Sequence, residues 1–308
     1  MKEKIIRILS TNAGRIVSGV EISLQTGISR VAVWKHMKKI QAEGYEITAS
    51  SRGYTLKDAA DLVLPFCFKN REKKIHFFPS LASTMDTARE IARKGNAHLN
   101  IVIANEQTQG RGRINRKWLS SPGGLWFTVI LEPNLPPPLS FKVNFAASLA
   151  LVKTVNHLFN IDASVKWPND ILVQGRKLAG LLSEMETRGD MISFVNIGIG
   201  LNVNNLPHEE EPGAVSIREI IGKKALRKEI LSCFLDRFES SLSTIHSGSI
   251  IDQWKPYTST IGTRVNIQTL TDTHSGIARD VDETGALILL LDNGVEKRII
   301  YGDCFYQI

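Results

Sequence analysis

One segment of the sequence concentrates positive charge between glycines. The run GRGRINRKW at residues 110–118 carries four cationic side chains, Arg111, Arg113, Arg116 and Lys117. Glycine lets backbone N–H groups approach an anion closely, and the cations supply the charge that a polyphosphate or an acyl phosphate requires. The pattern favours an anion-binding loop. Taken alone, such a loop could also bind nucleic acid or be a mobile exposed turn. The alternative for Trp118 is that it only anchors the loop in the core.

A second segment places a lysine at the start of a buried strand. KWPND at residues 166–170 is followed by RKLAGLLSE at residues 176–184. Pro168 fixes a turn, and the apolar run after Lys177 is typical of a buried strand. A lysine rooted there can extend its three-donor ammonium into a cleft and hold a carboxylate and an α-phosphate together. An ordinary surface lysine is the alternative for Lys177 considered alone.

A third segment, VNIGIGLNVNN at residues 195–205, is a strand interrupted by glycines. Glycines in a strand leave space for a ligand or for another backbone to approach. The sequence contains no G-x-G-x-x-G and no Walker lysine motif, so a Rossmann or P-loop nucleotide site is not supported.

The elements that must position these segments belong to an α+β domain. Strand-like and helix-like patterns do not alternate regularly, which predicts a mixed or mainly antiparallel sheet rather than a doubly wound one. We expect strands at 74–78, 101–104, 125–131, 178–185 and 191–199, and helices near 84–95, 140–160 and 224–245. After Pro256, short strands separated by turn residues predict a small β-barrel of about 50 residues.

The N-terminal residues have the pattern of a winged helix-turn-helix. Helices are expected at 3–13, 20–26 and 30–42, with Ser29 as the N-cap of the third helix. Val33, Met37 and Ile40 repeat at helical spacing and should face inward. The following YEITASSRGYTL has two short β-prone runs around a polar loop, which predicts a basic wing.

The charge distribution indicates an anionic partner for this N-terminal region. Residues 1–58 hold 10 Lys and Arg against 5 Asp and Glu, a net +5 out of +7 for the chain. A recognition helix needs cations for phosphates and polar side chains for base edges. We therefore expect DNA contacts from Ser29, Arg30, Trp34, Lys35, Lys38 and Arg52. A small helical domain with a solvated basic face is the alternative.

Bulk properties restrict the class of protein. A chain of 308 residues exceeds one ordinary core, and its 43% hydrophobic and 22% charged residues are typical of a soluble globular protein. Without a membrane-length apolar run or a secretory signal, a cytoplasmic location and no membrane partner are expected. Three cysteines at wide spacing argue against a disulfide framework and a zinc site, so no protein-bound metal site is expected.

Four motifs in one order, GRGRxxRKW, KWPND, RKLAG and IGxGLNV, resemble the biotin protein ligase family, in its bifunctional ligase and biotin operon repressor form. The resemblance implies a winged helix-turn-helix at 1–58, a linker at 59–73, and a biotin/lipoate ligase-like catalytic domain at 74–255. An SH3-like domain would follow at 256–308. The catalytic fold would be the one shared with class II aminoacyl-tRNA synthetases.

The same resemblance implies ligand-binding residues. Biotin would contact Ser83, Thr84, Met85, Gln107, Arg111, Gly112, Arg113, Lys177 and Gly180. ATP would contact Arg113, Arg116, Trp118, Asn169, Lys177 and Asn202, and catalysis would depend on Lys177, Arg113 and Arg116. The family often reads Ser-Thr-Asn where this chain has Ser83-Thr84-Met85. Met85 cannot supply an amide hydrogen bond, although a thioether packs against apolar rings.

By resemblance, the protein would join biotin and ATP to biotinyl-5′-AMP and transfer biotin to a lysine of a biotin carboxyl carrier domain. Mg²⁺ would be bound mainly through the phosphates. With biotinyl-AMP bound, a homodimer would bind operator DNA and repress biotin synthesis or transport genes. Three alternatives are a ligase that has lost operator binding, a biotin-sensing transcription factor without ligase activity, and a lipoate ligase, against which the GRGRxxRKW run argues.

Overall fold

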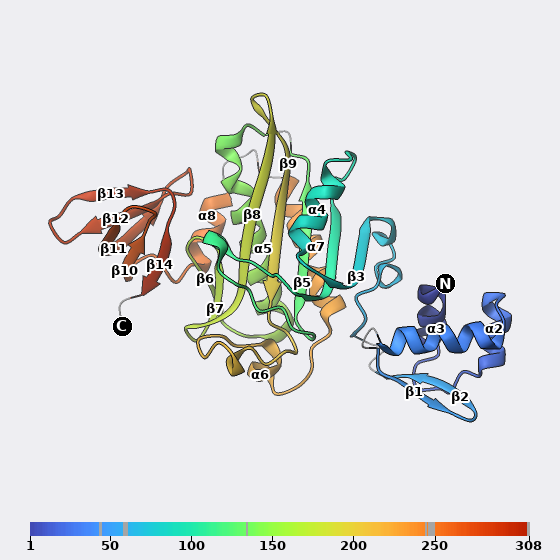
Figure 1. The fold of residues 1–308 in the computed structure, drawn as a ribbon. Coiled ribbons are helices and arrows are strands. Elements are labelled where there is room, and N and C mark those ends of the chain that lie inside the picture. The colour runs from blue at the N-terminus through green and yellow to red at the C-terminus, as the bar shows by residue number, and fades with distance from the viewer. Residues whose placement is uncertain (43–44, 58–60, 134, 244, 246–249, 307–308) are drawn as a thin grey trace. The chain divides into compact units, whose positions relative to one another are not determined.

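The computed structural model describes residues 1–42, 45–57, 61–133, 135–243, 245 and 250–306 (Figure 1). The chain divides into two compact units, Met1–Lys73 and Lys74–Ile308.

The first unit contains three helices and a β-hairpin, as predicted for a winged helix-turn-helix. Ser18 caps the second helix by accepting a hydrogen bond from the Glu21 N–H at 3.1 Å, and Gly27 ends it with a φ of 73°. The first helix ends at Thr11 rather than near residue 13, because the Asn12 side chain donates to the Ile8 carbonyl and closes its last turn. The elements are α1 (Lys2–Thr11), α2 (Gly19–Thr26), α3 (Arg30–Ala42), β1 (Ile47–Ser50) and β2 (Gly53–Leu56).

Residues 61–73, expected as part of a linker, pack within this first unit. Val63, Leu64 and Phe68 are buried. Arg7 of α1 pairs with Glu72 and places its guanidinium carbon 4.9 Å from the centre of the Phe66 ring. The segment includes the short 3-10 turn η2 (Pro65–Cys67).

The second unit is built on a seven-stranded sheet in the order β3-β4-β5-β9-β8-β7-β6. Only β3 and β4 are parallel, and every other neighbouring pair is antiparallel, which confirms the expected mixed sheet. Each strand predicted in this domain is present. The strands are β3 (Ile75–Leu81), β4 (Asn100–Gln107), β5 (Leu125–Leu131), β6 (Ala163–Lys166), β7 (Asp170–Val173), β8 (Arg176–Arg188) and β9 (Met191–Leu201).

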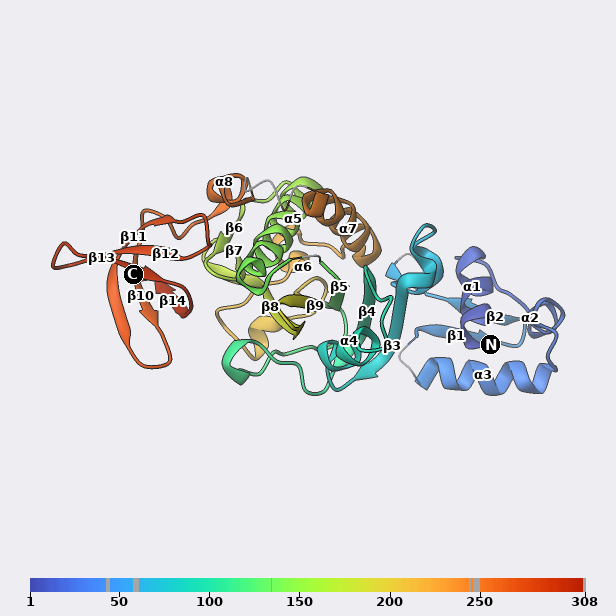
Figure 2. The same cartoon turned by 90° about the horizontal axis from the view of Figure 1, so that it is seen from above.

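Helices cover the two faces of this sheet unequally. The long helices α5 (Phe141–Phe159) and α7 (Arg227–Ser243) pack together on one face, and the short α4 (Thr84–Ala92) lies on the other (Figure 2). α5 buries twelve of its nineteen side chains, many of them Ala, Val or Leu, so this face is a closed core. The face that carries α4 is covered only in part. The short helices α6 (Ile217–Ile221) and α8 (Ile250–Trp254) complete the set described.

The C-terminal residues form a five-stranded antiparallel sheet in the order β13-β12-β11-β10-β14, as expected for an SH3-like domain. It is joined to the central domain through Trp167, whose N–H is bonded to Thr260 Oγ1 at 2.9 Å and whose indole is bonded to the Gly285 carbonyl at 3.1 Å. The strands are β10 (Arg264–Gln268), β11 (Thr273–Val281), β12 (Leu287–Leu291), β13 (Glu296–Ile299) and β14 (Asp303–Tyr306). Within the described ranges, no helix is long and apolar enough to span a membrane.

Candidate functional site

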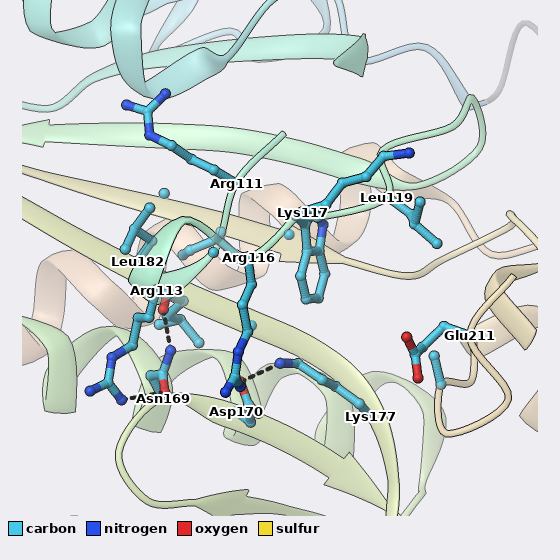
Figure 3. Close-up of a pocket in the computed structure, with 18 of the residues that line it drawn as sticks. Arg111, Arg113, Arg116, Lys117, Leu119, Asn169, Asp170, Lys177, Leu182 and Glu211 are labelled. Carbon is cyan, nitrogen blue, oxygen red and sulfur yellow. Dashed lines mark hydrogen bonds and ion pairs between the residues drawn. The ribbon is translucent and has the colours of Figure 1, made fainter. Parts of the chain in front are cut away.

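A pocket of about 610 Å³ lies on the face of the sheet that carries α4. The basic loop 110–118, the strands β8 and β9, the loop 207–214 and the start of β14 contribute its lining. Figure 3 shows Arg116, Lys177 and Glu211 among the side chains around it. All the residues that the resemblance implied for biotin or ATP line this one pocket. Residues as far apart in the sequence as Ser83 and Asn202 therefore converge at one site, together with all four motifs.

One end of the pocket is a network of buried polar groups. Ser83 caps α4 and accepts a hydrogen bond from the Met85 N–H at 3.3 Å. The Thr84 N–H and hydroxyl both donate to Gln107 Oε1, at 2.8 and 3.1 Å. The Gln107 Nε2 in turn donates to Ser120 Oγ at 2.8 Å. Because each group holds its neighbour, the side chains of Thr84 and Gln107 are positioned before any ligand binds.

Glycines of β8 and β9 form a floor under Trp118. A Cβ on Gly200 would lie 2.2 Å from Trp118 Nε1, and one on Gly180 would lie 3.0 Å from Cζ3. These two glycines are directly opposite each other in the antiparallel register. The indole can therefore lie flat against the sheet, where its Nε1 is buried and has no hydrogen-bond partner among the described residues.

Lys177 is held at the start of β8, as the sequence predicted. Its N–H donates to the Gly213 carbonyl at 2.8 Å, which ties the strand to loop 207–214. Its ammonium lies 2.8 Å from Asp170 Oδ1 and 5.2 Å from the centre of the Trp118 ring. Figure 3 shows the ammonium of Lys177 and the carboxylate of Asp170 directed toward each other within the pocket.

Two arginines of the basic loop contact the C-terminal sheet. Arg113 Nη1 donates to Asn169 Oδ1 at 3.3 Å and to the Gly302 carbonyl at 3.1 Å. Arg116 Nη2 lies 2.6 Å from Asp303 Oδ2, at the start of β14. Burial lowers the pKa of Arg113, and the nearby carboxylate of Asp303 opposes that shift. The cations of the loop are therefore partly neutralised by the C-terminal domain.

Arg111 differs from the other arginines of the loop, because its guanidinium turns away from Arg113 and Arg116 (Figure 3). It makes two hydrogen bonds to Asp86, at 2.9 and 2.8 Å, and one to Glu184 at 3.3 Å. The hydrogen bond from Arg111 lowers the pKa of Asp86. Its charge therefore ties the loop to α4 and β8. Arg111 lines the pocket, but its guanidinium is already paired with carboxylates.

The six residues expected to contact DNA are all exposed in the first unit. Ser29 Oγ accepts a hydrogen bond from the Ala32 N–H at 3.2 Å, so it caps α3 as predicted. Trp34 is 52% exposed, which is high for the largest apolar side chain, while Val33 and Met37 of the same helix are buried. The helix therefore presents an aromatic and basic face to the solvent.

Sequence reasoning missed several pocket residues. Asp170 lies inside the KWPND motif, and its position next to Asn169 was the available signal. Asp303 and Phe305 come from the C-terminal sheet, and no local pattern in the sequence connects them with the basic loop. Glu211, which faces the pocket from loop 207–214, likewise carries no motif (Figure 3).

Comparison with known families assigns the chain. The model of the Biotin/lipoate A/B protein ligase family matches residues 77–204. The Biotin protein ligase C terminal domain matches residues 260–306, and an HTH domain matches residues 2–55. These matches, together with a relative that is 34% identical over 96% of both chains, show that the chain belongs to the biotin protein ligase family, in the form that carries an N-terminal helix-turn-helix.

Relatives match this chain over nearly its whole length. The chain is 34% identical to the bifunctional ligase/repressor BirA of Bacillus subtilis, over 96% of both chains. It is 26% identical to the protein of the same name from Escherichia coli, over 97% of this chain and 95% of that one. Among solved structures, the biotin protein ligase from Aquifex aeolicus in complex with biotin and ATP superposes with a TM-score of 0.64. That pair is 28% identical, and the match covers 76% of this chain and 99% of the other.

Proposed function

We propose that this protein is a biotin protein ligase that also acts as a transcriptional repressor. It activates biotin with ATP to biotinyl-5′-AMP and transfers the biotinyl group to a lysine of a biotin carboxyl carrier domain. The observation that carries this proposal is the single pocket lined by all four ligase motifs, in a chain with a full-length ligase/repressor relative.

In the first step, a biotin carboxylate oxygen attacks the α-phosphorus of ATP, and the bond from that phosphorus to the pyrophosphate oxygen breaks. Two anions must meet, so the residues of the pocket must supply positive charge. Lys177 lies where its ammonium can exchange Asp170 for the carboxylate and the α-phosphate. Arg113 and Arg116 supply further cations from the loop. Biotin would occupy the Thr84 and Gln107 end, with ATP near Trp118, Asn169 and Asn202.

In the second step, the lysine amine of the carrier attacks the acyl carbon of the mixed anhydride. A C–N bond forms, the bond to the AMP oxygen breaks, and the amine loses a proton. The described residues do not pair a nucleophile with a base in the pocket, so we propose direct transfer without a covalent enzyme intermediate. The basic loop would exclude water from the anhydride until a carrier arrives.

Mg²⁺ fits this pocket as a phosphate-bound ion. In the described part of the chain, no cluster of three His, Cys, Asp or Glu is placed to hold a metal. The pocket does hold three separate carboxylates, Asp170, Glu211 and Asp303, and one or two carboxylates with phosphate oxygens suit Mg²⁺. When bound, the ion would neutralise phosphate charge and ease departure of pyrophosphate.

The second proposed activity is operator binding by the first unit. The HTH match over residues 2–55 and the exposed face of Arg30, Trp34 and Lys38 support it. A homodimer that forms when biotinyl-AMP is bound would place two such faces on a two-fold operator. Repression of biotin synthesis or transport genes would follow. The proposed domains are the helix-turn-helix at 1–58, with residues 61–73 packed in the same compact unit, the catalytic domain at 74–255 and the C-terminal domain at 256–308. A cytoplasmic location, where ATP is available, completes the proposal.

One experiment tests the ligase proposal directly. The purified protein is incubated with ATP, magnesium, labelled biotin and a carrier domain. Label on the carrier lysine, dependent on ATP, is expected, and label on lipoate acceptor domains is not. A protein that binds biotin without labelling any carrier would instead be a biotin sensor. Footprinting on DNA upstream of biotin genes, with and without biotinyl-AMP, tests the repressor proposal separately.

A further inference from the structure

Asn196 of β9 is a fully buried polar residue that the ligase motifs do not explain. Its side chain is 0% exposed. Among the residues that the structure describes, neither its Nδ2 nor its Oδ1 has a hydrogen-bond partner. A buried donor or acceptor without a partner destabilises the fold, so each such group calls for a physical reason.

The position of Asn196 provides that reason, because it adjoins the inner end of the ligand pocket. Asn196 and Gly198 are two residues apart on β9 and share one face of the sheet. Gly198 lines the pocket, and a Cβ placed on it would lie 2.6 Å from Met85 Sδ. Met85 thus lies over the strand one step from Asn196.

The course of α4 confirms that this helix passes over Asn196. One turn after Met85, Arg89 forms an ion pair with Glu184 of β8. Glu184 is the cross-strand neighbour of Asn196 in the sheet register. The carboxamide is therefore enclosed between the sheet and the first turns of α4, beside the end of the pocket formed by Thr84 and Met85.

We propose that Asn196 is a specificity-determining residue, whose carboxamide binds the cyclic urea of biotin when Met85 moves aside. This inference rests on the proposed ligase function. The urea presents one carbonyl acceptor and two N–H donors, and a carboxamide offers the matching donor and acceptor. The unbranched thioether of Met85 has three rotatable bonds, so it can change rotamer and open the path from the pocket to Asn196.

Met85 and Asn196 lie close together at the inner end of the pocket. The thioether of Met85 cannot form the hydrogen bonds of an amide. Asn196 would supply that amide from the strand beneath α4. Binding of the urea would then give the buried carboxamide the partners that it lacks among the described residues.

The test replaces Asn196 by leucine, which has nearly the same shape without polar atoms. We expect Asn196→Leu to raise the KM for biotin about tenfold, the equivalent of one lost hydrogen bond, and to leave the KM for ATP unchanged. Its unfolding temperature should equal or exceed that of the wild type, because an unpaired buried amide has been removed. A residue with a merely structural role would lower it.

A biotin analogue and a matched variant make the test specific. Wild-type protein should discriminate biotin from 2-iminobiotin, whose guanidine replaces the urea, and Asn196→Leu should lose part of that ratio. The control is Asn156→Leu on α5, where both carboxamide atoms are bonded to Ala163 at 3.0 and 2.8 Å. It should lower the unfolding temperature without changing the KM for biotin.

The outcomes separate this inference from the function on which it rests. An unchanged KM for biotin in Asn196→Leu, in a protein whose wild type biotinylates the carrier, would overturn the role of Asn196 alone. A wild type that forms no adenylate would refute the ligase proposal. Failure of both Asn196→Leu and the smaller Asn196→Val to fold would also overturn the inference, because it would show that the amide serves packing.

Discussion

At the scale of single residues, Lys177 combines a fixed backbone with a side chain that can change partners. Two backbone hydrogen bonds hold it, one from its N–H to the Gly213 carbonyl at 2.8 Å and one from the Val215 N–H to its carbonyl at 3.0 Å. Its ammonium pairs with Asp170 above the face of Trp118. An incoming carboxylate and phosphate can therefore compete for the ammonium without any movement of the strand.

The first prediction concerns this ammonium. Lys177→Ala should keep the fold but reduce the rate of adenylate formation on the order of a hundredfold or more, because a transition-state contact disappears. Pyrophosphate release is the measurement. Arg176→Ala, one residue earlier and outside the pocket lining, is the control and should retain nearly full activity. Pyrophosphate release at the wild-type rate in Lys177→Ala would remove the lysine from the mechanism.

The second prediction concerns the glycine floor. Gly200→Ala should raise the KM for ATP, because its Cβ would meet Trp118 Nε1 at 2.2 Å and push the indole off the sheet. Overpacking of this kind costs about 1–3 kcal/mol, or roughly tenfold to a hundredfold in binding. The control is Gly213→Ala, also in the pocket lining, where the nearest atom to the new Cβ is 3.8 Å away. Equal KM values in the two variants would contradict the role of Gly200.

At the scale of elements, the basic loop is held from two sides. On one side, Arg111 ties the loop to α4 and β8 through Asp86 and Glu184. On the other side, Arg113 contacts the carbonyl of Gly302, just before β14, and Arg116 pairs with Asp303, the first residue of β14. The glycines between these anchors allow the backbone to bend. Release of either anchor should therefore open the loop while the other end stays attached.

The third prediction tests the anchor next to β14. Arg113→Gly should let activated biotin escape, because the loop loses its contacts with Asn169 and Gly302 and gains backbone freedom. Adenylate formation should survive better than in Lys177→Ala, since Lys177 and Arg116 remain. The measurement is biotin label on a bystander protein that lacks a carrier domain. Unchanged bystander labelling with adenylate still produced would show that Arg113 does not retain the intermediate.

The fourth prediction concerns the hairpin between β11 and β12. Partial burial raises the pKa of Asp282, but hydrogen bonds from Thr284, Arg298 and Ala286 outweigh it and hold the pKa at about 2, against 3.8 ordinarily. A depressed pKa stabilises the fold above pH 4, and this contribution is lost as the pH falls from 4 to 2.

Asp282→Asn should therefore lower the free energy of unfolding by about 1–2 kcal/mol at pH 7, allowing for solvent screening. The difference from wild type should shrink below pH 4, which denaturant titrations at several pH values would measure. Asp292→Asn, at a more exposed ion pair with Arg264, should change the free energy by less than about 0.5 kcal/mol. A difference that stays constant down to pH 2 would exclude the carboxylate as its source.

At the scale of the whole molecule, the pocket and the exposed basic face belong to different compact units. Each residue of the pocket lining lies at position 83 or later, and the six expected DNA contacts lie before residue 53. Arg7 also packs against Phe66 and Glu72, so the first unit includes the segment up to Lys73. A clean separation of the two units therefore cuts after Lys73 rather than after residue 58.

The fifth prediction follows from that division. Removal of residues 1–73 should abolish sequence-specific DNA binding and leave biotin ligation within about threefold of the full chain, a change below 1 kcal/mol. A chain that lacks only residues 1–58 should still ligate biotin. It should be less stable than the 74–308 fragment, because Val63, Leu64 and Phe68 are buried in the full chain and lose their packing partners. Footprinting and carrier labelling check the two activities. Operator protection by the 74–308 fragment would refute the assignment of DNA binding to the first unit.

The sequence by itself determined the main elements and indicated residues that line one pocket. β5 spans Leu125–Leu131 and α3 spans Arg30–Ala42, the ranges expected from periodicity and capping. These features depend on interactions between residues a few positions apart, which a local pattern records. The order of four motifs indicated one site even though the distances between them were unknown.

Only the tertiary structure decided how those residues share their contacts. Arg111 and Arg113 lie two residues apart in one charged run, yet one pairs with Asp86 and the other contacts Gly302, 189 positions away. Likewise, the register of β8 against β9 sets Gly180 opposite Gly200 beneath Trp118, and Asn196 beside Glu184. Such partners are fixed by strand register and by the packing of distant segments, and neither is encoded in the residues next to each side chain.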